Sequence, residues 1–155
     1  MAVIGASGAE EGSEAWRLAE EVGRRLAEGG VALVCGGGGG VMEAASRAAA
    51  EAGGSVIGIV PGSSVNDANV YCSHVVATGI GHARNLAVVS SGEAVIAIGG
   101  EWGTLSEIGF ARVIGHEVVA LRSWELNGRE RMAGGPGVVA AETAEEAVAA
   151  ALAAL

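Results

Sequence analysis

The chain has 155 residues, with 18 Asp and Glu residues against 9 Lys and Arg residues, and its formal net charge at pH 7 is -9. A chain of this length is expected to form one domain, residues 1–155. All the basic residues are arginines, so no lysine is present to form a pyridoxal-phosphate Schiff base or to serve as the lysine of a P-loop. The acidic balance, without a basic cluster, also argues against nucleic acid as a partner.

Cysteine content and the N-terminal sequence indicate the cellular setting. Cys35 and Cys72 are too few for a disulfide framework, and Cys35, at the end of an apolar run, is expected to be a core residue. The N-terminal residues show neither a basic region nor an uninterrupted apolar stretch of signal-peptide or membrane-spanning length. We therefore expect a cytoplasmic protein without a membrane association.

The order of apolar runs predicts the fold class. Short apolar runs that end at glycine alternate with amphipathic helical patterns, which is typical of βα units around a mostly parallel sheet. We predict an α/β protein, a single Rossmann-like domain with about six or seven strands and helices on both faces of the sheet. Strands are expected near Ala2–Gly5, Val31–Cys35, Ser55–Val60, His74–Ala77, Ala94–Ile98, Glu117–Leu121 and Val138–Ala140.

Helical patterns fill the gaps between these strands. The first carries apolar residues on one face and charged residues on the other, as a surface helix does. Thr143 and Glu146 form a capping box at the start of the last helix. Between Arg122 and Gly137 the pattern lapses into mixed charge and a Gly-Gly-Pro-Gly sequence, which predicts a mobile loop. The helices are expected at about Ser13–Glu28, Val41–Ala52, Ala83–Ser91, Leu105–Gly115 and Ala144–Ala154.

Four segments follow predicted strands at the sheet edge where doubly wound folds bind ligands. They are Gly5–Gly8, Gly36–Gly40, Pro61–Ser64 and Gly99–Thr104. Glycine lets the backbone approach a ligand closely, and the helix that follows presents free N–H groups and a positive dipole end to an anion such as phosphate. The alternative is that these glycines only form tight turns between strands and helices.

Two common ligand classes do not fit the sequence. A dinucleotide fingerprint requires a third glycine where this chain has Val41, and an acidic residue where the end of the next strand has Pro61–Ser64. NAD bound in the standard mode is therefore not expected. A metal site is not expected either, because Cys72-x-His74 with His82 lacks a third and a fourth ligand at fixed spacing.

Several side chains near the glycine segments are candidates for ligand chemistry. Glu107 ends a Thr104-x-x-Glu107 pattern, so it is either the last member of a capping box or a carboxylate that acts on the ligand. Arg84 can hold a phosphate through its guanidinium fork or form a surface ion pair. Trp102 can stack on a base or simply cover the site, and Glu101 is expected to be a solvated acid.

Taken in order, these segments resemble the LOG (LONELY GUY) superfamily, long labelled "possible lysine decarboxylase", a label that the absence of lysine contradicts here. Gly36–Gly40 followed by Val41-Met42 is similar to the family's glycine-rich loop. Gly81–Asn85 is similar to its Met-His-x-Arg-Lys motif, and Ile98–Glu107 to its Pro-Gly-Gly-x-Gly-Thr-x-x-Glu motif. The match covers roughly residues 1–121. The resemblance implies a Rossmann-like fold, a homodimer or larger assembly, and a nucleotide-phosphate ligand.

This chain departs from the family motifs at three positions. Ile98 replaces the proline, Asn85 the lysine and Gly81 the methionine. With the segment Val41–Ala45 and the short length, these departures make the chain more similar to the branch that contains the molybdenum-cofactor carrier protein.

Two functional hypotheses remain open. The chain resembles an enzyme that hydrolyses the N-glycosidic bond of nucleoside 5'-monophosphates, with Glu107 stabilising the oxocarbenium-like transition state or holding the ribose hydroxyls and Arg84 positioning the phosphate. It also resembles a carrier or sensor that binds a nucleotide or the molybdenum cofactor without turnover. Neither hypothesis requires a further cofactor. The residues expected to bind the ligand or its phosphate are Gly5, Ser7, Gly36, Gly37, Gly38, Gly39, Gly40, Gly99, Gly100, Gly103 and Thr104.

The third and fourth helices carry small, alanine-rich faces that a single sheet cannot wholly cover. We therefore expect a homodimer or homotetramer.

Overall fold

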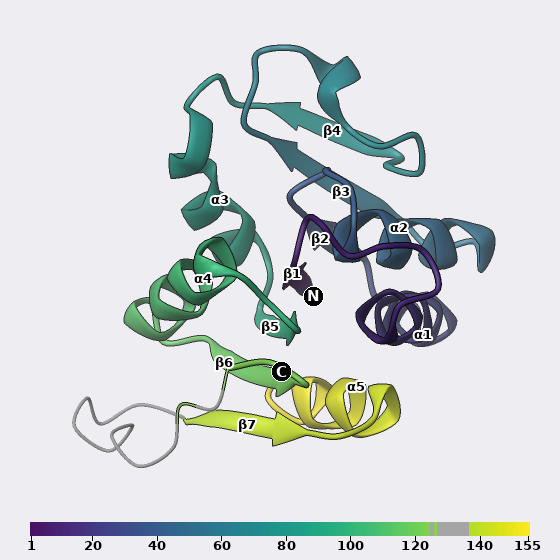
Figure 1. The fold of residues 1–155 in the computed structure, drawn as a ribbon, viewed down its shortest axis with the longest axis vertical. Coiled ribbons are helices and arrows are strands. Elements are labelled where there is room, and N and C mark those ends of the chain that lie inside the picture. The colour runs from purple at the N-terminus through teal and green to yellow at the C-terminus, as the bar shows by residue number, and fades with distance from the viewer. Residues whose placement is uncertain (125, 127–136) are drawn as a thin grey trace.

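A computed structural model describes residues 1–124, 126 and 137–155. In these residues seven parallel strands form one sheet in the order β4-β3-β2-β1-β5-β6-β7 (Figure 1). The predicted α/β class with a mostly parallel sheet is confirmed. The strands are β1 (Ala2–Gly5), β2 (Leu33–Cys35), β3 (Val56–Val60), β4 (His74–Ala77), β5 (Ala94–Ile98), β6 (Glu117–Leu121) and β7 (Val138–Ala141).

Helices cover both faces of the sheet, as predicted. In Figure 1, α1, α2 and α5 lie on one side of the strands, and α3 and α4 on the other. The described helices are α1 (Glu14–Glu28), α2 (Val41–Glu51), α3 (Arg84–Ser91), α4 (Trp102–Val113) and α5 (Ala144–Leu152), with short 3-10 turns at η1 (Val65–Asp67) and η2 (Gly81–Ala83).

The strands contribute to a core on each face because successive side chains point in opposite directions. In β1, Val3 packs into the core beneath α1, α2 and α5, whereas Ala2 and Ile4 pack into the core beneath α3 and α4. Small residues allow the helices to approach closely. A Cβ on Gly23 of α1 would overlap the backbone of Ala45 in α2, so this close approach of the two helices requires glycine at position 23.

The strand order creates a crevice beside β1. The chain passes from β1 outward to β4, then crosses through α3 to β5, which pairs with β1 on its other side. Connections leave β1 and β5 in opposite directions, so the carboxyl ends of these strands border the position where doubly wound folds bind ligands.

Several boundaries differ from the predicted ones. β2 begins at Leu33 rather than Val31 because the Val31 N–H donates to the Leu26 carbonyl (2.8 Å) and so closes the end of α1. α4 begins at Trp102 rather than Leu105 because Glu101, in extended conformation, is its N-cap.

The predicted capping box at the start of α5, formed by Thr143 and Glu146, is confirmed. The loop predicted for Arg122–Gly137 falls largely on residues 125 and 127–136, which lie outside the described residues. Among the described residues, no helix has the length and apolar character needed to cross a membrane.

Candidate functional site

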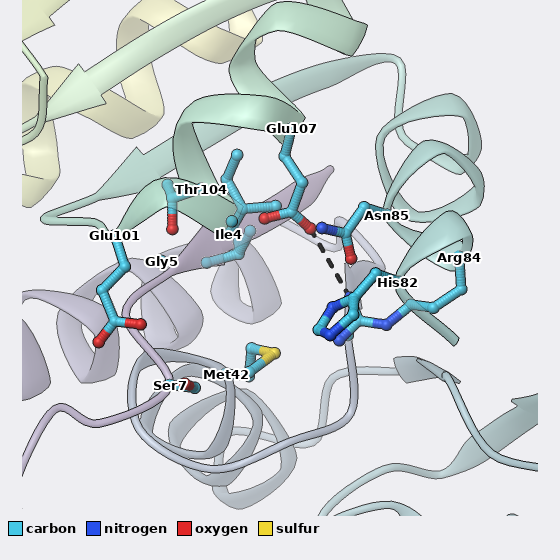
Figure 2. Close-up of a pocket in the computed structure, with 13 residues that line it drawn as sticks. Ile4, Gly5, Ser7, Met42, His82, Arg84, Asn85, Glu101, Thr104 and Glu107 are labelled. Atoms are coloured by element: carbon cyan, nitrogen blue, oxygen red, sulfur yellow. Dashed lines mark ion pairs between the residues drawn. The ribbon is translucent and has the colours of Figure 1, made fainter. Parts of the chain in front are cut away.

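A cavity of ≈ 220 Å³ lies in the crevice beside β1. The end of β1, the loop after β2 and the N-terminal ends of α3 and α4 contribute its walls (Figure 2). Segments that are far apart in the sequence therefore meet at one place. The lining residues are Val3, Ile4, Gly5, Ser7, Gly36, Met42, His82, Arg84, Asn85, Glu101, Gly103, Thr104 and Glu107.

Arg84 provides a buried guanidinium group at this cavity. Its side chain is 14% exposed, and its Nε has no hydrogen-bond partner among the described residues. The guanidinium lies directly over Gly36, where a Cβ would stand 2.7 Å from Cζ. A side chain at position 36 would therefore displace the guanidinium of Arg84. The buried Nε–H is a donor without an acceptor among the described residues, which calls for an explanation such as an absent ligand.

Glu107 faces Arg84 from the second turn of α4, as the dashed line in Figure 2 shows. The distance from Arg84 Nη1 to Glu107 Oε1 is 3.7 Å, which is too long for a hydrogen bond and indicates a loose ion pair. Because Glu101 and not Thr104 caps the helix, the capping-box interpretation of Glu107 is wrong. Burial raises the pKa of Glu107 to about 7, an effect that Arg84 opposes and that Cys35 reinforces.

The N-terminus of α4 adds a second positive element. No side chain caps the first turn at Glu101, and two residues of that turn, Gly103 and Thr104, line the cavity. The free N–H groups and dipole of a helix N-terminus favour an anion. With the guanidinium of Arg84, this arrangement suits a phosphate or a comparable oxyanion.

The cavity brings together only part of the predicted site. Its lining includes the predicted residues Gly5, Ser7, Gly36, Arg84, Gly103, Thr104 and Glu107. Gly37, Gly38, Gly39, Gly40, Gly99 and Gly100 do not line it, and their role in ligand binding stays a prediction.

The glycines that follow Gly36 have different structural roles, and the sequence pattern does not show which glycine has which role. Gly40, with φ of 62°, is the N-cap of α2, where a Cβ would overlap the backbone of Ser7. The carbonyl oxygens of Gly37 and Gly38 accept hydrogen bonds from the backbone and side chain of Asn69, at 2.7 and 2.9 Å. These contacts fix the loop that carries Gly36 to the cavity.

Some lining residues were not predicted as site residues. His82 and Asn85 belong to the same motif as Arg84, and that proximity could have marked both; Asn85 is buried. Met42 and Ile4 carry no such signal, because an apolar residue on a strand or helix is most often a core residue. Glu101 is exposed at the rim, in agreement with the prediction of a solvated acid.

The two cysteine thiols lie behind the Gly36 loop. Cys35 is buried in the core, as predicted. The neighbouring Cys72 thiol, and after it Ser46 and the Gly37 N–H, lower the pKa of Cys35 to about 7 against the opposing effect of burial. The proximity of Cys35 and burial raise the pKa of Cys72. In residues 1–124, 126 and 137–155, no group of three or more His, Cys, Asp or Glu side chains is placed to hold a metal ion. The absence of a metal site stays a prediction.

Comparisons with known proteins place most of the chain in one family. The model of the SLOG cluster4 family matches residues 1–148. An uncharacterised protein of Archaeoglobus fulgidus is 42% identical over 122 residues, which is 79% of each chain.

Two solved structures with closely similar folds are described by their ligand. The molybdenum cofactor binding protein of Rippkaea orientalis is 30% identical, with a TM-score of 0.84 over 98% of this chain and 94% of that one. The molybdenum cofactor carrier protein of Chlamydomonas reinhardtii is 29% identical, with a TM-score of 0.83 over 98% and 94%.

A more distant structural similarity is to a DNA processing protein, which concerns the prediction that nucleic acid is not a partner. The DNA processing protein A of Streptococcus pneumoniae is 20% identical, with a TM-score of 0.72 over 96% of this chain and 60% of that one. At this identity the likeness shows the fold alone, so the absence of a nucleic-acid partner stays a prediction.

Proposed function

This chain belongs to the SLOG cluster4 family, and we propose that it is a carrier or sensor that binds a phosphate-bearing small molecule of the nucleotide or molybdenum-cofactor class. The phosphate is held in the cavity beside β1, and the ligand leaves unchanged. The carrier proteins of similar structure support this class of ligand. These carrier proteins also support the resemblance of the chain to the carrier branch of the LOG superfamily.

The observation that carries the proposal is the guanidinium of Arg84. It is buried, its Nε lacks a partner among the described residues, and its ion pair with Glu107 is loose. A phosphate oxygen in the cavity would complete its hydrogen bonds in the fork geometry that arginine offers. The N-terminus of α4, through Gly103 and Thr104, supports the same anion from another side.

The raised pKa of Glu107 argues against one catalytic role, that of an ionised carboxylate that stabilises an oxocarbenium-like transition state. A carboxylate that stabilises an oxocarbenium-like transition state acts in its ionised form. Burial raises the pKa of Glu107 to about 7, so a large share of the molecules holds it protonated at neutral pH. The neutral Asn85 beside Arg84 adds no charge that would keep Glu107 ionised.

Guanosine 5'-monophosphate is a suitable first probe, because it combines a planar ring with a phosphate monoester. We expect calorimetric titration to show that Arg84→Ala weakens its binding by roughly 10- to 150-fold, the range for hydrogen bonds to charged groups. Arg24→Ala, which removes an exposed arginine from α1, is the matched control and should bind as the wild type does. Equal affinity of the Arg84→Ala variant and the wild type would contradict the proposal.

The molybdenum-cofactor class has its own test. Wild type and Arg84→Ala are purified from a host that makes the cofactor, and bound molybdenum is measured by mass spectrometry. We expect molybdenum with the wild type and much less with the variant. Absence of molybdenum from the wild type would leave the nucleotide class as the ligand, and equal content in both proteins would contradict the role of Arg84.

The hydrolase reading is the second candidate, because Arg84 and Glu107 meet at one cavity. Chromatography of a panel of nucleoside 5'-monophosphates after incubation with wild type and Glu107→Gln separates it from the carrier. A carrier releases no free base from any of them. Base release by the wild type that disappears in the variant would replace the carrier by a phosphoribohydrolase.

We also propose that the chain forms a homodimer or homotetramer through the outer faces of α3 and α4. Both helices lie wholly within the described residues, and neither has an exposed charged side chain. Leu86, Phe110 and Val113 are exposed there, and Val113 is 84% exposed. Copies that each carry a net charge of -9 repel one another least through an uncharged apolar face.

Sedimentation velocity tests this assembly. Val113→Glu should yield monomers, because a buried unpaired carboxylate at the interface is costly. Ala149→Glu, an equal change of charge on the exposed face of α5, should leave the wild-type assembly intact. A monomeric wild type would refute the proposed interface.

A further inference from the structure

The cavity at Arg84 is too small to enclose a whole nucleotide or pterin-type ligand. Its volume is ≈ 220 Å³, whereas pockets that bury most of a drug-sized molecule measure roughly 300–1,000 Å³. A ligand whose phosphate reaches Arg84 therefore has a part that lies outside this cavity.

A second cavity, of ≈ 280 Å³, borders the same loop. Gly99 and Gly100 line the second cavity, while the next residues of the loop, from Glu101 to Thr104, contribute to the first. Gly99 and Gly100 have φ of 56° and 137°, values that favour glycine, so no side chain projects from this part of the loop. The other residues of the second cavity are Arg122, Ser123 and Trp124.

Two tryptophans stand beside these glycines. Trp102 is 77% exposed, and its ring centroid lies 5.4 Å from that of Trp124, with the ring planes at 40°. The Nε1 of Trp124 is buried without a hydrogen-bond partner in the part of the chain that the structure describes. It lies 3.2 Å from the position that a Cβ on Gly100 would take. Trp102 thus offers an exposed ring face for stacking, and the half-buried Trp124 beside it holds an N–H without an acceptor in the described residues; a planar ligand with a polar edge could use both.

We propose that the Trp102–Trp124 pair, with Gly99 and Gly100, is the subsite for the ring of the ligand; this inference rests on the function proposed above. The ring stacks on Trp102 beside the cavity that the two glycines border. The Trp124 indole, whose Nε1 is covered in the free protein, turns to donate its N–H to a ring nitrogen or carbonyl. The phosphate of the same molecule is held at Arg84. The ligand class is thus a phosphate monoester of a planar heterocycle, and a sugar phosphate alone fills only half of the site.

Two probes separate the halves of this site. Ribose 5-phosphate carries the phosphate without a heterocyclic base, and guanosine 5'-monophosphate carries both the phosphate and the base. Trp102→Ala should weaken guanosine 5'-monophosphate binding by roughly 5- to 150-fold, the value of one stacked base, and leave ribose 5-phosphate binding within about twofold. Trp124→Phe keeps the aromatic ring and removes the N–H, so a loss of roughly two- to tenfold for the nucleotide alone is expected.

Val70→Ala is the matched control, since it removes an exposed apolar side chain that lines neither cavity, and both probes should bind it as they bind the wild type. If neither probe binds the wild type and no molybdenum copurifies with it, the proposed function fails. If both bind and Trp102→Ala weakens neither, or weakens both equally, the function stands and the ring subsite is overturned. A change of assembly in Trp102→Ala, measured by sedimentation, with equal losses for both probes would assign Trp102 to the subunit interface instead.

Discussion

Replacement of Glu107 by glutamine should flatten the dependence of folding stability on pH. Glu107 is only 7% exposed, and burial raises its pKa from the ordinary 4.5 to about 7. Each pKa unit corresponds to 1.36 kcal/mol of free energy. Ionisation of this buried carboxyl group therefore costs the folded state about 3 kcal/mol relative to the unfolded chain.

The sign of the effect follows from the direction of the pKa shift. Because the folded pKa of Glu107 is higher than the unfolded value, its contribution to stability is fully present below pH 4.5 and is lost as the pH rises through about 7. Glutamine does not ionise. Between pH 4.5 and pH 8 the wild type should thus lose about 3 kcal/mol more of its unfolding free energy than Glu107→Gln does.

Urea unfolding at a series of pH values, followed by circular dichroism, measures this difference. Titrating groups that do not interact with Glu107 contribute to both proteins and largely cancel between them. The Cys35 thiol is the exception, because its charge also raises the pKa of Glu107. Glu101→Gln, at an exposed acid of the same loop, should follow the wild-type curve and serves as the control. Parallel curves for the wild type and Glu107→Gln would refute the argument that Glu107 is held in a poorly solvated site.

Three further substitutions test the packing of the loops and helix ends. Gly36→Ala should displace the Arg84 guanidinium, with about 1–3 kcal/mol of lost stability and a loss of guanosine 5'-monophosphate affinity similar to that of Arg84→Ala; normal affinity would disprove the contact. Gly40→Ala should cost at least about 1–2 kcal/mol in urea unfolding, because alanine is strained at φ of 62°. Thr143→Ala removes the capping box of α5 and should cost about 1 kcal/mol, with no effect on ligand binding; an unchanged midpoint would contradict the cap.

The fold was largely accessible from the sequence because its signals are local. Apolar runs such as Ala94–Ile98 are buried on both faces of a parallel sheet, so they appear in the sequence as short, continuous strands. The order of the strands in the sheet could not be predicted from the sequence. It depends on which strand each connection returns to, and no residue between Ala83 and Ser91 records that α3 crosses back to the far side of β1.

The candidate site was predictable in its chemistry and less so in its geometry. Arg84 and Glu107 were identified as residue types in motifs, and the fold brings both to one cavity. The choice between a cap and a buried carboxylate for Glu107 depended on whether α4 begins three residues earlier than its sequence pattern indicates. Likewise, a run of five glycines does not reveal which glycine has which role. Gly36 makes room for a guanidinium, whereas Gly40 is the N-cap of α2 and has a positive φ.

The pairing of β1 with β5 has a consequence for how the protein acquires its ligand. Ala2 pairs with Val95, so the centre of the sheet can form only after the chain has been synthesised as far as β5. Contacts of such high sequence separation form slowly, and the cavity beside β1 exists only in the complete native state. A ligand at Arg84 therefore stabilises the folded protein against global unfolding, as RT ln(1 + [L]/Kd). The melting temperature of the whole domain can accordingly be used to screen ligands.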